Sequence, residues 1–359
     1  MKSALKEVNK IGLQQRTDLY GVAEDFIKNF INQEFESDDA AEFFHWRETL
    51  STKAIEPLAE NRLGSVHLAR MNNMRRVNKF LEQVNRTTPG GKYVVVCLET
   101  KDSRRTRILN KFPRVISRPY YALDFILKRV FPKWKPTYKI YFWLTKGKNR
   151  VISYTEAVGR LFSCGFEVKN SMRVGNLTYI IAQKTGEPAY DYEPTYGALV
   201  RLRRVGKDGR LFNVFKFRTM HPYSEYAQDY VFKMNNLEKG GKLKDDFRIT
   251  GWGKIFRKLW IDELPMLYNW LRRDMKLVGV RPLSNHYYSL YPKDVQALRT
   301  SVKPGLLPPF YADMPETFDE IVESERVYLL AYLKNPIRTD VRYFFSALYN
   351  IFIKRARSV

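Results

Sequence analysis

The chain has 359 residues, a length that suggests two domains, and its 62 Lys and Arg against 38 Asp and Glu give a formal net charge of +24. A content of 44% hydrophobic residues excludes wholesale disorder, and no run of about 20 residues is apolar enough to cross a membrane. Two cysteines are too few for a disulfide framework or a cysteine zinc site. The charge predicts an anionic partner, which is nucleic acid, a phosphorylated ligand or an anionic membrane surface.

The first part of the chain has the apolar spacing of helices. Apolar residues recur every three or four positions from Leu19 to Phe30, and similar stretches continue to about residue 85. We expect a helical N-terminal extension over residues 1–45, followed by an α/β module over residues 46–186.

Within this module, helix and strand signals alternate. Residues 89–91 read Pro-Gly-Gly and predict a turn, and the valine-rich run at 93–98 predicts a buried strand. Ser153 is placed to cap a helix, with Glu156 at the spacing of a capping box. Gly165 then ends that helix.

Two further strands are predicted at 166–168 and 177–182. This order of helix, PGG turn, strand, helix, CGF turn and strand pair resembles the distal half of a class I methyltransferase domain. The chain contains no GxGxG sequence. We therefore expect an incomplete methyltransferase-like module that binds no S-adenosylmethionine.

A segment dense in aromatic and basic residues lies inside this module, over residues 118–150. One interpretation is a pair of helices packed on the sheet. The other is an anchor at a membrane interface, where Trp, Tyr, Lys and Arg are common. The sequence leaves both open.

An acidic linker with two prolines is predicted over residues 187–196, and a second domain over residues 197–359. This domain opens with a cationic hairpin, in which KDG at 207–209 is the turn and 212–217 the return strand. Taken alone, the charge could also protect an edge strand from pairing. The cations of this stretch are Arg201, Arg203, Arg204, Lys207, Arg210, Lys216 and Arg218.

Two adjacent carboxylates precede a proline in the sequence DELP. Because Pro265 is tolerated only in the first turn of a helix, we expect the helix to begin near 262–264. This would place Asp262 and Glu263 at a helix N-terminus, where the helix dipole stabilises anions. By itself, the pair could simply cap the helix.

Cations flank the carboxylate pair on both sides. A paired carboxylate among cations suits phosphoryl transfer, because the cations neutralise a diphosphate and carboxylates bind Mg²⁺ or attack phosphorus. The sequence therefore predicts a phosphoryl-transfer site. The flanking cations are Arg248, Lys254, Arg257, Lys258 and Arg281.

Residues 197–359 resemble the bacterial sugar transferase family, the monotopic polyprenyl-phosphate phosphoglycosyl transferases. The fold implied for this part is an α+β domain rich in helices. Five motifs carry the resemblance, in order: RVGKDGRLFNVFKFRTM, DDFRITGWGKIFRK, DELPMLYNWLRRDMKLVGVRPLS, VKPG, and LKNPIRTDVRYFFSALYNIF.

The resemblance implies the chemistry of the site. Asp262 would attack the sugar-proximal phosphorus of a UDP-sugar, release UMP and carry the phosphosugar, with Glu263 as its dyad partner. Mg²⁺ held with Asp262 would neutralise the diphosphate. The resemblance further implies that phosphates are bound by Arg257, Arg281, Lys216, Arg218, Arg204 and Lys207.

The resemblance also implies partners and a location. The phosphosugar would pass to undecaprenyl phosphate or another polyprenyl phosphate, which starts exopolysaccharide, capsule or lipopolysaccharide synthesis. The protein would work on a membrane surface, as a peripheral or monotopic protein at the cytoplasmic face of the bacterial inner membrane. No nucleic acid partner is expected, because no nucleic-acid-binding motif accompanies the charge. A homodimer is left open.

Two departures from the family pattern support an alternative, a non-catalytic relative that acts as a scaffold in a glycan-synthesis complex. First, a polar linker stands where the family has a hydrophobic re-entrant helix. Membrane contact would then fall to residues 118–150 or to the C-terminal helix, whose residues from Val341 to Phe352 form an apolar face followed by Lys354, Arg355 and Arg357. That face could equally pack inside the protein. Second, GLLPPFYAD follows VKPG where the family usually reads GITGWxQ.

Overall fold

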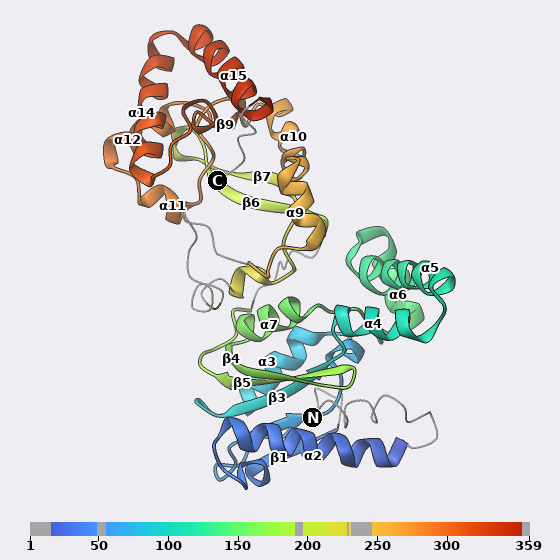
Figure 1. The fold of residues 1–359 in the computed structure, drawn as a ribbon. Coiled ribbons are helices and arrows are strands. Elements are labelled where there is room, and N and C mark those ends of the chain that lie inside the picture. The colour runs from blue at the N-terminus through green and yellow to red at the C-terminus, as the bar shows by residue number, and fades with distance from the viewer. Residues whose placement is uncertain (1–15, 49–54, 191–196, 228–229, 231–245, 354–359) are drawn as a thin grey trace. The chain divides into compact units, whose positions relative to one another are not determined.

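A computed structural model of the protein describes residues 16–48, 55–190, 197–227, 230 and 246–353, and the chain forms two compact units (Figure 1). Unit 1 comprises Met1–Tyr196 and Pro222–Gln228, and unit 2 comprises Gly197–His221 and Asp229–Val359. The short segment 222–228 therefore belongs to unit 1, although the residues on both sides of it belong to unit 2.

Unit 1 is an α/β fold built on a five-stranded sheet with the strand order β1-β2-β3-β5-β4. The first three strands are parallel, β5 runs antiparallel to β3, and β4 forms a hairpin with β5. The strands are β1 (Phe44–Arg47), β2 (Gly64–His67), β3 (Tyr93–Leu98), β4 (Phe166–Val174) and β5 (Leu177–Lys184).

Helices cover both faces of this sheet (Figure 1). Helix α2 buries Ile27, Phe30 and Ile31 in one cluster with Val95 and Cys97 of β3. Because side chains alternate along a strand, the buried Val94 and Val96 face the other side, which α3 and α7 cover. The helices and helical turns are α2 (Arg16–Glu34), η1 (Ala40–Phe43), η3 (Met71–Asn73), α3 (Val77–Thr87), α4 (Lys101–Lys111), α5 (Arg114–Phe125), η4 (Ile126–Val130), η5 (Phe131–Lys133), α6 (Lys135–Thr145), α7 (Tyr154–Ser163) and η7 (Ser224–Ala227).

The strand predicted at 93–98 is confirmed, and Ser153 caps α7 by accepting a hydrogen bond from the backbone N–H of Glu156. The expectation that residues 1–85 are helical is wrong, because β1 and β2 lie within them. All four residues of β2 are buried, so this strand shows no alternation of apolar and polar residues to reveal it. The turn, strand, helix and strand pair predicted for 89–184 are present, and their likeness to a methyltransferase stays a prediction.

Unit 2 combines two small sheets with helices. Strands β6 and β7 form the predicted cationic hairpin, and β8 pairs in parallel with β9. One core cluster of unit 2 joins Val278 and Val280 to Tyr328 and Tyr343 of the last two helices. The elements are β6 (Leu199–Val205), η6 (Lys207–Gly209), β7 (Leu211–Phe217), α9 (Gly251–Lys258), η8 (Ile261–Glu263), α10 (Met266–Leu271), β8 (Lys276–Val278), α11 (Asn285–Ser289), α12 (Lys293–Ser301), β9 (Gly305–Leu307), α13 (Phe310–Asp313), α14 (Phe318–Lys334) and α15 (Pro336–Phe352).

The C-terminal helix α15 packs with a different face from the apolar one seen in the sequence. Tyr343 and Ala347 are buried, whereas Phe345 and Phe352 are 64% and 73% exposed. The predicted basic residues Lys354, Arg355 and Arg357 lie outside the described residues. In the part of the chain that the structure describes, every helix is too short or too polar to cross a bilayer.

Candidate active site

The two carboxylates of DELP lie in a helical turn that precedes a short helix. Asp262 and Glu263 belong to the turn η8, and α10 begins only at Met266, with Pro265 as its N-cap residue. The helix therefore starts later than predicted. Since α10 has six residues, its dipole is a weak source of stabilisation for the pair.

Side-chain cations, rather than the helix dipole, provide the positive charge beside Glu263. Lys216 of β7 donates a hydrogen bond from Nζ to Oε1 of Glu263 over 2.6 Å. A guanidinium nitrogen of Arg281 lies 4.0 Å from the same oxygen. Burial lowers the pKa of Lys216, and Glu263 opposes that shift.

Asp262 has a different electrostatic environment from its neighbour. Burial, and then the negative charge of Glu263, raise the pKa of Asp262, and Lys216 and Arg257 oppose the rise without cancelling it. This rise opposes the stabilisation of the ionised carboxylate that was expected from a helix terminus. A further positive charge beside Asp262 would be stabilised at this point.

Arg257 reaches the site from helix α9. Its Nε donates to Oγ1 of Thr219 over 3.0 Å, and burial lowers its pKa while the charge of Asp262 opposes that shift. The same helix is fixed to Thr219 at its start, because the N–H and the hydroxyl of Thr250 both donate to the Thr219 carbonyl. Thr250 also caps α9 by accepting from the N–H of Gly253.

Asp246 is a further carboxylate whose charge acts on Arg257, and no role was predicted for it. Asp246 binds Arg248 through two hydrogen bonds of 2.8 Å, and it also accepts from the backbone N–H of Arg248. Burial raises the pKa of Asp246, but these hydrogen bonds from Arg248 outweigh it, so the pKa lies below its usual value. Asp246 also acts electrostatically on Arg257.

The remaining residues predicted to bind phosphate are Arg204, Arg218 and Lys207, and they differ in their surroundings. Burial, and then the charge of Arg281, lower the pKa of Arg204. Arg218 donates from Nε to the carbonyl of Gly197 over 3.0 Å. Lys207 is exposed in the turn of the β6–β7 hairpin, and no contact of the described residues joins it to the carboxylate pair.

Asn269 holds α10 against β7, and it was not predicted. It is fully buried, its Oδ1 accepts from the N–H of Phe215 and its Nδ2 donates to the carbonyl of Asn213. A polar residue within the apolar stretch MLYNWL is the one sequence signal that could have revealed it. These two hydrogen bonds fix the helix that follows the carboxylate pair to the strand that supplies Lys216.

Asp262 fits a magnesium ion in part. Mg²⁺ prefers carboxylate oxygens and commonly completes its shell with water and substrate phosphate oxygens. A metal would also offset the burial and the repulsion from Glu263 that raise the pKa of Asp262. No group of three or more His, Cys, Asp or Glu residues suited to a metal occurs within the described ranges. A metal here would therefore depend on oxygen ligands from the substrate.

In the site as a whole, nearby cations do not fully compensate the charge of Asp262, whereas Glu263 beside it is bound by Lys216 and lies near Arg281. Lys216, Arg257 and Arg281 are placed to attract an anion to Asp262. Such an arrangement can bind a phosphate group and present a carboxylate oxygen to its phosphorus.

Known proteins resemble the part of the chain that holds this site. Residues 190–354 match the family model for bacterial sugar transferases, a match that begins seven residues before the boundary predicted at 197. The chain is 39% identical over 136 residues to galactosyl transferase CpsE of Streptococcus agalactiae, an alignment that covers 37% of this chain and 30% of that protein.

Other relatives have related names. The chain is 41% identical over 115 residues to the undecaprenyl-phosphate galactose phosphotransferase of Salmonella typhimurium, which covers 30% of this chain and 24% of the relative. It is 38% identical over 109 residues to the exopolysaccharide production protein ExoY of Sinorhizobium fredii, at 29% and 48% coverage. The chain thus spans less than half the length of these relatives. Residues 190–354, a little less than half of this chain, are therefore similar to bacterial sugar transferases.

Proposed function

We propose that this protein is a phosphoglycosyl transferase that moves a sugar 1-phosphate from a UDP-sugar to undecaprenyl phosphate or a similar polyprenyl phosphate. The observation that carries the proposal is the Asp262–Glu263 pair, set among Lys216, Arg257 and Arg281. Relatives whose names state this type of reaction support it.

In the first step, a carboxylate oxygen of Asp262 attacks the sugar-proximal phosphorus of the UDP-sugar. A bond forms between this oxygen and phosphorus, the diphosphate P–O bond breaks, and UMP leaves. Arg257 and Arg281 bind the phosphate oxygens, and Lys216 holds Glu263 in place. Glu263 assists as the dyad partner of Asp262.

In the second step, a phosphate oxygen of the carrier attacks the same phosphorus. The bond to Asp262 breaks and its carboxylate is restored, so no net oxidation or proton loss is required. The covalent step is physically reasonable, because two anionic substrates never have to approach each other directly.

A Mg²⁺ ion held with Asp262 would supply positive charge to the diphosphate in the first step. Asp262 would be the protein ligand of this ion.

The loop after VKPG supports a proposal on sugar choice. In this loop Tyr311 of α13 packs against Trp260, with ring centroids 4.8 Å apart, and Trp260 lies two residues before Asp262. We propose that this aromatic pair contributes to the choice of sugar.

The carrier is a lipid, so the proposed reaction takes place at a membrane surface. We propose a peripheral or monotopic position at the cytoplasmic face, with the methyltransferase-like unit 1 as an accessory module. Glycan initiation for exopolysaccharide, capsule or lipopolysaccharide is the proposed role.

The test measures UMP release with Mg²⁺, polyprenyl phosphate and a panel of UDP-sugars. Asp262→Asn should abolish release, while Asp319→Asn, at an exposed residue in the first turn of α14, should leave it unchanged. With a UDP-sugar and no carrier, the mass of the protein should rise by one phosphosugar, and Asp262→Asn should show no increase. Absence of UMP across the panel would refute the proposal and favour the scaffold alternative.

A further inference from the structure

The segment Arg114–Thr145 of unit 1, which comprises α5, η4, η5 and α6, exposes an unusual amount of apolar surface. Isolated exposed apolar side chains are normal, whereas a continuous set of them marks an interaction surface. In this α5–α6 segment the exposed large apolar residues are Val115, Ile116, Tyr120, Leu123, Ile126, Leu127, Val130, Trp134, Tyr138, Ile140, Trp143 and Leu144.

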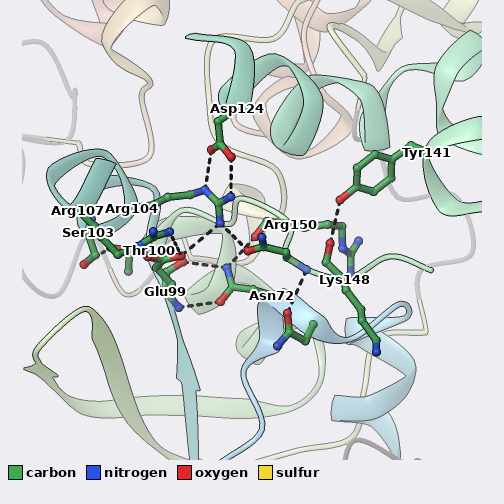
Figure 2. A network of polar contacts seen from close by, with 12 residues as sticks. Asn72, Glu99, Thr100, Ser103, Arg104, Arg107, Asp124, Tyr141, Lys148 and Arg150 are labelled. Atoms are coloured by element: carbon green, nitrogen blue, oxygen red, sulfur yellow. Dashed lines mark hydrogen bonds and ion pairs between the residues drawn. The ribbon is translucent and has the colours of Figure 1, made fainter. Parts of the chain in front are cut away.

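Charged residues hold the inner side of the same segment. Arg104 of α4 binds Asp124 of α5 through two hydrogen bonds of 2.7 Å (Figure 2). The same guanidinium also contacts Glu99 and Asn149, so it joins the end of β3 to the segment.

A second inner contact lies further along the segment. Glu156 of α7 is 1% exposed as a side chain and accepts hydrogen bonds from Arg129 and Lys133. Lys133 and Arg129 belong to the turns between α5 and α6. Buried ion pairs therefore help to fix the segment to unit 1, together with Tyr141 of α6, which is 4% exposed.

This arrangement is the reverse of a helix pair on an ordinary protein surface. Such helices turn apolar residues toward the core and charged residues toward water. Here ion pairs fix the inner side, and residues such as Trp143 and Leu144 are 79% and 67% exposed. The exposed apolar side is therefore available to a partner that removes it from water.

The charge of the segment selects the partner. Residues 114–145 contain seven Lys and Arg and a single acid, Asp124, which is turned inward to Arg104. The exposed cations Arg114, Arg118 and Lys139 lie among the exposed apolar and aromatic side chains. Trp and Tyr with basic residues are typical of the boundary between acyl chains and anionic headgroups.

The lengths of the helices agree with a position at this boundary. Helix α5 has 12 residues and α6 has 11, and a membrane-crossing helix needs about 20. Amphipathic helices of this kind lie in the plane of the interface.

We propose that the outer side of the α5–α6 segment inserts into the interface of an anionic lipid bilayer. Unit 1 would thus contribute its own membrane contact, separate from the carboxylate site of unit 2. The inference does not rest on the proposed reaction.

The test places a fluorophore on the segment. Both native cysteines, Cys97 and Cys164, are buried, so a cysteine introduced by Leu144→Cys can be labelled selectively with an environment-sensitive dye such as NBD. The control is Asn176→Cys, at an exposed position in the turn between β4 and β5. Circular dichroism checks that each labelled full-length protein is folded.

The labelled proteins are mixed with vesicles of phosphatidylcholine, with and without phosphatidylglycerol, and without any nucleotide sugar. The dye at 144 should shift to the blue with phosphatidylglycerol vesicles and be quenched by lipids that carry a nitroxide in the acyl chain. The dye at 176 should not change. Because each cation near an anionic surface contributes about 1 kcal/mol, the double variant Arg114→Gln and Lys139→Gln should weaken the binding read by the dye at 144 about 30-fold.

Two results would overturn the inference. One is an unchanged spectrum at 144 with every vesicle composition. The other is a blue shift at 144 that grows with protein concentration in the absence of vesicles, which would assign the surface to self-association. A protein that releases no UMP but shows the lipid response at 144 would separate this inference from the proposed function.

Discussion

Helix α9 carries Arg257 toward the carboxylate pair, and Gly253 lets this helix approach the end of β7. A Cβ at Gly253 would lie 2.1 Å from the carbonyl oxygen of Thr219, whereas Cβ contacts below 3.0 Å essentially never occur. The Gly253→Ala variant must therefore move α9 away from Thr219 by about 0.9 Å, since the obstacle is backbone and cannot rotate aside.

This displacement acts on both stability and activity. Overpacking of this kind costs about 1–3 kcal/mol of unfolding free energy. It also stretches the hydrogen bond of 3.0 Å from Arg257 to Thr219, and with it the position of the guanidinium beside Asp262. A misplacement of about 1 Å in a catalytic group can cost about 100-fold in rate. We expect UMP release by Gly253→Ala to fall by about that factor.

Gly251 provides the matched control, because it lies on the same helix and a Cβ there would meet no atom within 4 Å. Gly251→Ala should keep full activity and be as stable as the native protein or more stable, by at most about 1 kcal/mol. The measurements are UMP release and urea unfolding of both variants. If Gly253→Ala matches Gly251→Ala in both, the assignment of Arg257 to a position fixed by Thr219 is wrong.

Other expected outcomes concern single buried groups. Lys216→Met should lower UMP release about 100-fold by freeing Glu263, while Lys293→Met at an exposed residue should not. Glu156→Gln should lower the unfolding free energy by about 3–5 kcal/mol, compared with less than about 1 kcal/mol for the half-exposed Glu167→Gln. Cations hold the pKa of Glu156 well below its usual range despite its burial. The stabilisation by Glu156 is therefore present at neutral pH and is lost as pH falls through that lowered pKa. Urea unfolding between pH 7 and pH 3 should show this loss for the native protein and not for Glu156→Gln. Asn269→Ala should cost about 2–3 kcal/mol in the same unfolding measurement, because two buried backbone groups lose their partners.

Local patterns predicted the parts of the fold that depend on neighbouring residues. The valine run of β3, the Ser153 cap and the β6–β7 hairpin are confirmed, since each follows from side chains a few positions apart. Strands β1 and β2 were missed because four-residue strands are too short to show a period.

The carboxylate pair was visible because Asp262 and Glu263 are adjacent and followed by Pro265. The residues that position it were not, because their contacts join distant parts of the chain. Asn269 reaches Phe215 across 54 positions, and Arg257 reaches Thr219 across 38. No spacing rule within a single sequence connects such pairs.

The segment Pro222–Gln228 has a consequence for any attempt to divide the protein. It leads from the strand with Lys216 toward the helix with Arg257, yet it is counted with unit 1, where Tyr223 and Ala227 are 2% and 0% exposed. The backbone of Tyr223 lies so close to Gly159 of α7 that a methyl group there would collide with it. A fragment that begins after the acidic linker would contain residues 222–228 without the rest of unit 1. Tyr223 and Ala227, which are buried in the whole protein, would then be exposed to solvent. A single cut in the chain cannot separate the two units intact, because the backbone passes between unit 1 and unit 2 three times.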